Sequence, residues 1–296
     1  MKKHQTIIFV SVSIVVLVLF FGLVLVQLAL STLQNLSASS LNKEGSVKSS
    51  QVSFGELQVA KEDKFLSDLS SFVATSSAIP ASSSASLGIA ITNLSSNRTF
   101  GLSLDKSFEL ASVEKLLVAA YAFSKIDKFQ IKEDTIISGK PLIEHLKLLI
   151  NQSNNESWAV LTTYFGILQL QDYAKEQDLA SFRVAGGTNL ANPVDVNLLL
   201  SKIYTDLLKQ SSKEKLLTFM HDTAFEQRIP QGLPKEALVY HKTGTFDNIA
   251  NDAGIIVHAK NPYILTVLTQ NPTSQSAVED LIQEVSKKVW DFYDSV

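Results

Sequence analysis

The sequence predicts an α/β protein of the α+β kind, with an antiparallel sheet formed by both ends of the folded domain, flanked by helices and interrupted by a helical subdomain. Strand-like alternation occurs early, at residues 87–94 and 99–104, and returns only late, within residues 237–269. Helical patterns fill the interval. Such segregation is typical of an antiparallel sheet with inserted helices, since regular alternation of strands and helices would favour a parallel sheet.

An N-terminal transmembrane helix is also predicted. Residues 7–30 carry no charge, and such a segment is long enough to cross a hydrocarbon core of ~30 Å. Lys2 and Lys3 precede it, which favours a cytoplasmic N-terminus and an extracytoplasmic domain. A cleavable signal peptide is the alternative, but its apolar core is normally ~7–15 residues long and ends at a small-residue cleavage site. We therefore expect residues 1–34 to be an uncleaved signal anchor in the cell membrane.

Two further segments precede the main domain. Residues 35–53 are rich in Ser, Asn and Gln and predict a flexible stalk. Within residues 54–85, apolar side chains recur at helical spacing as far as Thr75, and a Ser-rich linker containing Pro80 follows. Residues 86–296 then form the predicted folded and catalytic domain.

That domain begins with a hairpin over residues 87–104, whose turn is Ser95 to Arg98. A helical pattern starts at or near Ser112 and runs through Phe123. The remaining expected helices are residues 142–151, 157–165, 168–177, 194–209, 212–226 and 277–293, and the late strands are residues 237–241, 254–258 and 263–269.

Composition excludes several classes of function. The chain of 296 residues has a net charge of −3 and no basic patch, so no nucleic-acid partner is expected. It contains no cysteine, which excludes disulfides, thiolate metal sites and a cysteine nucleophile. We expect neither a metal nor another cofactor, and the sequence does not indicate an oligomeric state.

Ser112 and Lys115 form a Ser-x-x-Lys motif at the predicted start of a strongly apolar helix. Residues three apart lie on one face of a helix, so the lysine amine can take the serine proton if burial favours its neutral form. The motif is weak alone, because Ser40 to Lys43, Ser103 to Lys106 and Ser212 to Lys215 also match it. Only Ser112 opens a core helix.

Ser153 and Asn155 form a Ser-x-Asn motif at an interhelical junction. A helix cap explains these residue types equally well, because Ser and Asn are favoured there. The sequence Lys242-Thr243-Gly244 follows an apolar strand pattern and occurs once. Its lysine offers a positive charge, its threonine a hydroxyl, and its glycine a close approach of the backbone to a substrate.

The three motifs occur in an order that resembles the class A β-lactamase and penicillin-binding serine hydrolase family, over residues 86–296. The hairpin, the C-terminal helix, His241 and the stretch Asn251-Asp252-Ala253-Gly254 add to the likeness. The resemblance implies a β-lactamase-like fold in which Ser112 is the acylated nucleophile. Lys115 would be its base or the partner of that base.

The resemblance assigns the other roles as well. Ser153 would pass a proton to the leaving nitrogen, and Asn155 would bind the substrate amide. Lys242 and Thr243 would hold the substrate carboxylate, next to Gly244. The backbone N–H groups of Ser112 and Thr245 would form the oxyanion hole.

The sequence departs from the family at the omega loop, which in class A β-lactamases carries a glutamate that drives deacylation. Here residues 178–193 contain no glutamate. No arginine stands near Asn251 to offer a second clamp on a carboxylate, and residues 129–141 form a shorter connection than is usual. Because general base catalysis is typically worth ~10²–10⁴-fold, we expect slow deacylation.

The sequence therefore predicts a membrane-anchored extracytoplasmic serine hydrolase that forms an acyl-enzyme with a β-lactam. One alternative is a D,D-peptidase-like penicillin-binding protein acting on D-Ala-D-Ala-type cell-wall peptides. An alternative of another class is a non-catalytic sensor that binds cell-wall peptide or β-lactam.

Overall fold

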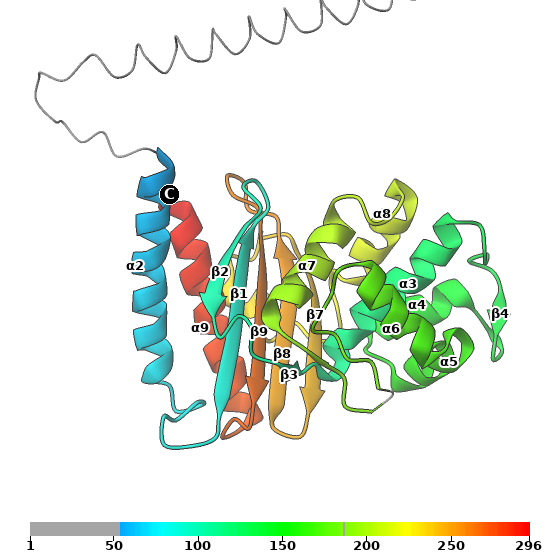
Figure 1. Cartoon of the computed structure of the whole chain (residues 1–296), viewed down its shortest axis with the longest axis horizontal. Helices are drawn as coiled ribbons and strands as arrows, with labels where there is room; N and C mark the ends of the chain where they lie inside the picture. The colour runs from blue at the N-terminus through cyan, green and yellow to red at the C-terminus, as the bar shows by residue number, and fades with distance from the viewer. Residues whose placement is uncertain (1–53, 186) are drawn as a thin grey trace, which may run out of the picture. The chain divides into compact units, whose positions relative to one another are not determined.

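The computed structural model describes residues 54–185 and 187–296 (Figure 1). The predicted signal anchor (residues 1–34) and stalk (residues 35–53) lie outside these residues. Among the residues described, no helix combines the length and the apolar character that crossing a membrane requires.

A five-stranded antiparallel sheet is the centre of the domain, in the order β2-β1-β9-β8-β7. The pairing of β1 with β9 joins the two ends of the domain, as the sequence predicts. The strands are β1 (Ser86–Asn93), β2 (Arg98–Leu102), β7 (Val239–Phe246), β8 (Ile249–Ile256) and β9 (Tyr263–Gln270).

Four strands of two residues each were not predicted, because two residues carry no periodic pattern. β3 (Phe108–Glu109) pairs with β6 (Leu190–Ala191), and β4 (Ile136–Ile137) pairs with β5 (Lys140–Pro141). The first pair ties the segment before Ser112 to the segment before α7 (Pro193–Tyr204).

Helices cover both faces of the sheet, as Figure 1 shows. On one face lie α2 (Phe54–Ala74) and α9 (Gln275–Asp294). On the other side lie η1 (Ala111–Glu114), α3 (Lys115–Asp127), α4 (Leu142–Asn151), α5 (Asn155–Phe165), α6 (Ile167–Glu176), α7 (Pro193–Tyr204) and α8 (Gln210–Phe219). A short turn of helix, η2 (Pro230–Gly232), precedes β7.

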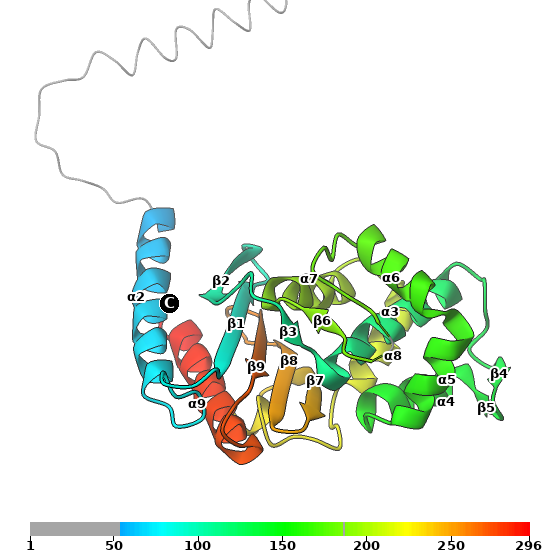
Figure 2. The same ribbon diagram turned by 60° about the horizontal axis from the view of Figure 1, so that its bottom comes forward.

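The sheet separates two hydrophobic cores. Successive side chains of a strand point to opposite faces, so Ile255 and Leu268 join the core of the helical subdomain, whereas Ile256 and Leu265 join the core under α2 and α9. The central strands are buried on both faces and form a rigid support for groups at the edge strand β7. Figure 2 shows the helical subdomain beside that edge.

The predicted boundaries were wrong for two helices and two strands. Two helices end early, α7 at Tyr204 and α8 at Phe219, because the chain turns after each; after α8, Asp222 adopts a left-handed backbone conformation. Strands β7 and β8 are longer than predicted, so Lys242 lies inside β7 and Asn251 lies inside β8. Their polar residues interrupt the hydrophobic pattern although they are buried.

Candidate active site

The start of α3 brings Ser112 and Lys115 into one turn. Ser112 lies in η1, a 3₁₀ turn, and Lys115 is the first residue of α3. Ala111 before it has a φ of 47°, an uncommon conformation for a residue with a side chain. Ser112 lines a cavity of about 550 Å³, whereas Lys115 is only 2% exposed. The serine hydroxyl is therefore accessible and the amine is held in the protein interior.

Lys115 is bonded to the second motif. Its Nζ donates to the Ser153 carbonyl oxygen at 2.6 Å, to Ser153 Oγ at 3.3 Å and to Asn155 Oδ1 at 2.7 Å. Within the part of the chain that the structure describes, Ser112 Oγ makes no hydrogen bond.

The second motif combines a cap with two functional groups. Asn154, the middle residue, caps α5 by accepting a hydrogen bond from Ser157 N at 2.7 Å. Ser153 has a φ of 53°, and this turn directs its hydroxyl toward both lysines. The capping explanation therefore applies to Asn154, and Ser153 and Asn155 remain available to Lys115.

Strand β7 brings the third motif against the nucleophile. Lys242 Nζ donates to Ser153 Oγ at 3.0 Å and to the Thr243 carbonyl oxygen at 2.8 Å. A Cβ at Gly244 would lie 2.4 Å from the Leu110 carbonyl oxygen and 3.1 Å from Ser112 N. Only glycine allows β7 to pass this close to the turn that carries Ser112.

The predicted residues thus come together from three segments of the chain. Ser112, Lys115, Asn155 and Thr245 line the cavity, and Ser153 and Lys242 join them through hydrogen bonds. The Thr243 side chain is buried beside Lys242 and does not line the cavity. The remaining wall includes Gly187, Thr188, Asn189 and Phe246.

Burial shifts the pKa values of both lysines. Burial lowers the pKa of Lys115 to about 8, although the carboxyl group of Glu114 raises it. Burial also lowers the pKa of Lys242 to about 7, and the neighbouring charge of Lys115 adds to this effect. Near neutral pH, both amines are therefore able to change charge.

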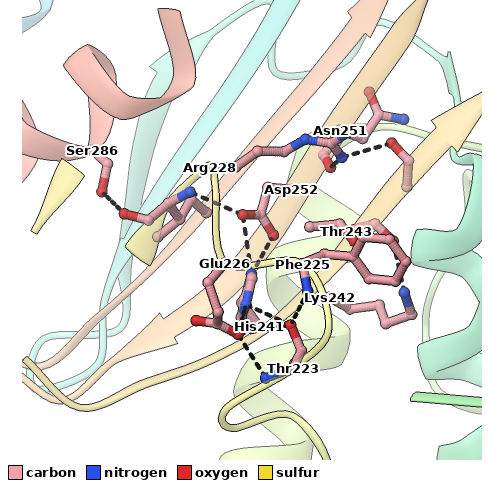
Figure 3. Close-up of polar contacts among 12 residues, drawn as sticks. Thr223, Phe225, Glu226, Arg228, His241, Lys242, Thr243, Asn251, Asp252 and Ser286 are labelled. Carbon is pink, nitrogen blue, oxygen red and sulfur yellow. Dashed lines mark hydrogen bonds and ion pairs between the residues drawn. The ribbon is translucent and has the colours of Figure 1, made fainter. Parts of the chain in front are cut away.

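Arg228 is a cation that sequence reasoning missed. It precedes β7, is 1% exposed, and donates to the Asn251 carbonyl oxygen at 2.7 Å and to the Gly244 carbonyl oxygen at 3.0 Å (Figure 3). Its Nη2 donates to Thr245 Oγ1 at 2.6 Å. The prediction that no arginine lies near Asn251 was wrong, because this arginine reaches Asn251 from another part of the chain.

A buried network supports the other side of β7 (Figure 3). His241 Nδ1 lies 3.0 Å from Asp252 Oδ1, and His241 Nε2 lies 3.1 Å from Glu226 Oε1. Burial lowers the pKa of His241, but the charge and hydrogen bonds of Asp252, with those of Glu226, outweigh it and raise the value to about 9. The charged network fixes β7 to β8 behind the motif.

The fold and the ordered motifs define a serine hydrolase of the class A β-lactamase and PBP-A group. Residues 71–293 match the model of the Beta-lactamase enzyme family, and the chain belongs to that family.

Known relatives are distant in sequence. The chain is 23% identical to the β-lactamase VEB-1 of Pseudomonas aeruginosa, over 71% of this chain and 86% of that protein. It is 24% identical to a β-lactamase of Bacteroides uniformis, over 62% of this chain and 78% of that protein.

Solved structures share the fold. PBP-A superimposes with a TM-score of 0.72 at 21% identity, over 79% of this chain and 97% of PBP-A. A class A β-lactamase from Bacteroides cellulosilyticus gives a TM-score of 0.72 at 23% identity, over 80% of this chain and 99% of that one. A mutant of PBP-A has been solved as an acyl-enzyme complex with penicillin G.

Proposed function

We propose that this protein opens the amide bond of β-lactams by forming an acyl-enzyme at Ser112. The observation that carries the proposal is the position of Ser153 Oγ, which lies 3.3 Å from Lys115 Nζ and 3.0 Å from Lys242 Nζ. A hydroxyl bridging two buried amines is suited to moving a proton across the site. The acyl-enzyme of the PBP-A mutant with penicillin G supports the choice of substrate.

In the proposed acylation, neutral Lys115 takes the proton of Ser112 Oγ as this oxygen attacks the lactam carbonyl carbon. The backbone N–H groups of Ser112 and Thr245 stabilise the negative charge on the carbonyl oxygen. Ser153 then passes a proton to the leaving nitrogen. In this proposal the C–N bond breaks and an ester at Ser112 remains.

The groups on β7 hold the substrate. Lys242 supplies positive charge for the carboxylate that penicillins carry, with Thr243 beside it. Arg228 lies beneath Thr245, donates to its Oγ1 at 2.6 Å and is ion-paired with Glu279 at 3.0 Å, so it holds Thr245 in position. Asn155 is placed to bind the amide of the substrate.

The test is a time course of intact mass. The full chain, kept in mild detergent, is mixed with penicillin G and quenched in acid at intervals. We expect one penicilloyl adduct, which is lost in Ser112→Ala. Ser103→Ala is the matched control, because Ser103 and Lys106 repeat the motif outside the cavity. Absence of both an adduct and hydrolysed penicillin in the unmodified chain contradicts the proposal.

D,D-peptidase activity is the second candidate. Residues 178–193 contain no glutamate, and a site without that group is compatible with slower release of the acyl group and with transfer from cell-wall peptides. An acylated D-Ala-D-Ala peptide distinguishes the two functions. Release of D-Ala at a higher kcat/KM than penicillin hydrolysis favours the peptidase.

We also propose that the protein is anchored in the cell membrane through residues 7–30, with the catalytic domain outside the cytoplasm. The uncharged character of that segment and the two preceding lysines support this topology. Intact cells treated with an external protease should lose the catalytic domain. Protection of the domain in intact cells contradicts this topology.

A further inference from the structure

Glu114 is a buried carboxyl group that the acylation chemistry does not use. It lies between Val113 and Lys115 and lines the same cavity as Ser112, yet it is only 3% exposed. Its Oε2 is enclosed and has no hydrogen-bond partner among the residues that the structure describes. A buried carboxyl oxygen without a partner is costly, so the position requires an explanation.

The surroundings of Glu114 favour proton exchange. Burial raises its pKa to about 7, against the lowering influence of Lys115, of the Trp158 indole and of Lys242. Trp158 Nε1 is likewise buried without a partner in the described part of the chain. The carboxyl group thus lies near two lysines and an indole N–H, lines the cavity, and has one oxygen without a hydrogen-bond partner among the described residues.

Among the described residues that line the cavity, no other side chain supplies this combination. The segment in the place of an omega loop contributes Gly187, Thr188 and Asn189 to the cavity, which include no carboxylate. Glu109 is the other carboxylate among the lining residues, but it is partly exposed on β3. Glu114 lies next to Lys115 and is shielded from solvent.

From this geometry we propose that Glu114 is the general base that hydrolyses the acyl-enzyme at Ser112, in place of an omega-loop glutamate. The inference rests on the proposed function, because it requires an ester at Ser112. The absence of an omega-loop glutamate led us to expect slow deacylation. With Glu114 of the Ser-x-x-Lys motif as the base, we expect deacylation to be catalysed.

The Glu114 carboxylate takes one proton from a water molecule while the water oxygen forms a bond to the ester carbonyl carbon. The tetrahedral intermediate collapses, the bond from the carbonyl carbon to Ser112 Oγ breaks, and the serine oxygen receives the proton from Glu114 by way of Lys115. Acyl-enzyme and water become a carboxylic acid and free serine, and no electrons are exchanged.

The test separates acylation from release. The full chain in mild detergent is acylated with penicillin G, excess penicillin is removed, and loss of the adduct is followed by intact mass. Glu114→Gln keeps the shape of the protonated side chain but cannot act as a base. We expect its release rate to fall by ~10²-fold or more, while the adduct at Ser112 still forms.

Three variants keep the result interpretable. Glu109→Gln tests the competing carboxylate, and Glu156→Gln is the control for an exposed carboxylate next to Asn155. The proposal is overturned if Glu109→Gln loses release of the acyl group while Glu114→Gln keeps it. Equal slowing of acylation and release in Glu114→Gln also overturns it, because that result indicates that Glu114 is a structural counter-ion for the lysines. Failure of the unmodified chain to give either an adduct or hydrolysed penicillin refutes the proposed function itself.

The pH dependence of the release rate is a second readout. The base form of Glu114 accumulates above its pKa of about 7, so the release rate of the unmodified chain should rise as pH passes through 7. The groups that face it, Lys115, Lys242 and Trp158, remain in Glu114→Gln, and the rise should be absent from that variant. A rise that persists in Glu114→Gln overturns the proposal.

Discussion

Lys115 must be held in place by hydrogen bonds and must also be able to lose its proton near neutral pH. A lysine in water is almost fully protonated at neutral pH and cannot act as a base. At Lys115 burial lowers the pKa to about 8, while Glu114 moderates the shift. Three oxygen atoms of Ser153 and Asn155 hold the ammonium form. The residue is therefore well ordered and still able to lose its proton.

The first prediction concerns the pH dependence of acylation. The neutral form of Lys115 increases as pH approaches and passes about 8, so the limiting acylation rate should rise over that range. Lys242, with a pKa of about 7, loses charge over the same range, so the penicillin concentration for half-maximal rate should rise too. Stopped-flow measurement with a reporter penicillin checks both quantities.

Two variants complete that experiment. Lys115→Arg removes the base, because arginine stays protonated, and should lower acylation by ~10²-fold or more. Lys106→Arg is the control in a second Ser-x-x-Lys sequence. A Lys115→Arg variant with an unchanged acylation rate would show that Lys115 is not the base.

The second prediction concerns Arg228. Hydrogen bonds to charged groups are worth ~1.5–3 kcal/mol, and ~1.4 kcal/mol is a factor of ten. Arg228→Gln removes the charged donor to Thr245 Oγ1 and leaves Glu279 without its ion-pair partner, so the second-order rate constant for acylation by penicillin G should fall ~10–100-fold. Arg228→Lys, which keeps the charge, should lose less. Thermal melting of both variants separates this effect from unfolding, and equal rate constants in all three chains would exclude a role in recognition.

At the scale of elements, β7 shows why sequence patterns located the motif but misjudged the strand. Lys242 and Thr243 are polar and buried, so a pattern search based on apolar residues ends the strand before them. The pairing of β7 with β8 continues to Phe246. The contacts that make this possible come from residues distant in sequence, such as Ser153 and Arg228.

The third prediction tests the close packing of β7 on the nucleophile turn. Gly244→Ala would place a methyl group 2.4 Å from the Leu110 carbonyl oxygen, so the strand must shift. We expect the free energy of unfolding to fall by ~1–3 kcal/mol and acylation by penicillin to fall at least ~10-fold. Gly187→Ala is the stability control, since its Cβ would meet no atom within 4 Å. Denaturant unfolding compares the two, and equal stability would contradict the packing argument.

The fourth prediction concerns the network behind β7. His241 has a pKa of about 9, above its ordinary value of about 6.5. Its stabilising contribution should be complete below the ordinary value and should disappear as pH rises through about 9. For Glu226, burial raises the pKa, but the hydrogen bond and charge of His241 bring it to about 2. Its contribution is present above the ordinary value of 4.5 and lost as pH falls toward 2.

Replacement of the histidine tests this network. His241→Gln leaves Asp252 buried without its charged partner, and such losses cost ~3–5 kcal/mol. His258→Gln should cost less, because its partner Asp294 is exposed. Urea unfolding at several pH values measures both. A His241→Gln variant that keeps the alkaline loss of stability would assign that loss to another group.

At the scale of the whole molecule, the pairing of β1 with β9 joins the two ends of the domain. The fold brings together motifs whose order along the chain was known from the sequence but whose spatial positions were not. The hairpin β1–β2, the late strands and the helical insertion follow from local periodicity. Ser112, Ser153 and Lys242 meet because β7 lies at the edge of the sheet, beside η1. Arg228 and Glu114 carried no recognisable signal, since a single charged residue usually lies at the surface. Only folding shows that both are buried.

The site of acylation is the central claim. The full chain in mild detergent is treated with penicillin G, quenched in acid and digested with pepsin, and the modified residue is located by peptide fragmentation. We predict a single penicilloyl ester on Ser112. An ester on another serine contradicts the account. So does the absence of both an ester and hydrolysed penicillin from the unmodified chain, under conditions where a known penicillin-binding protein is labelled.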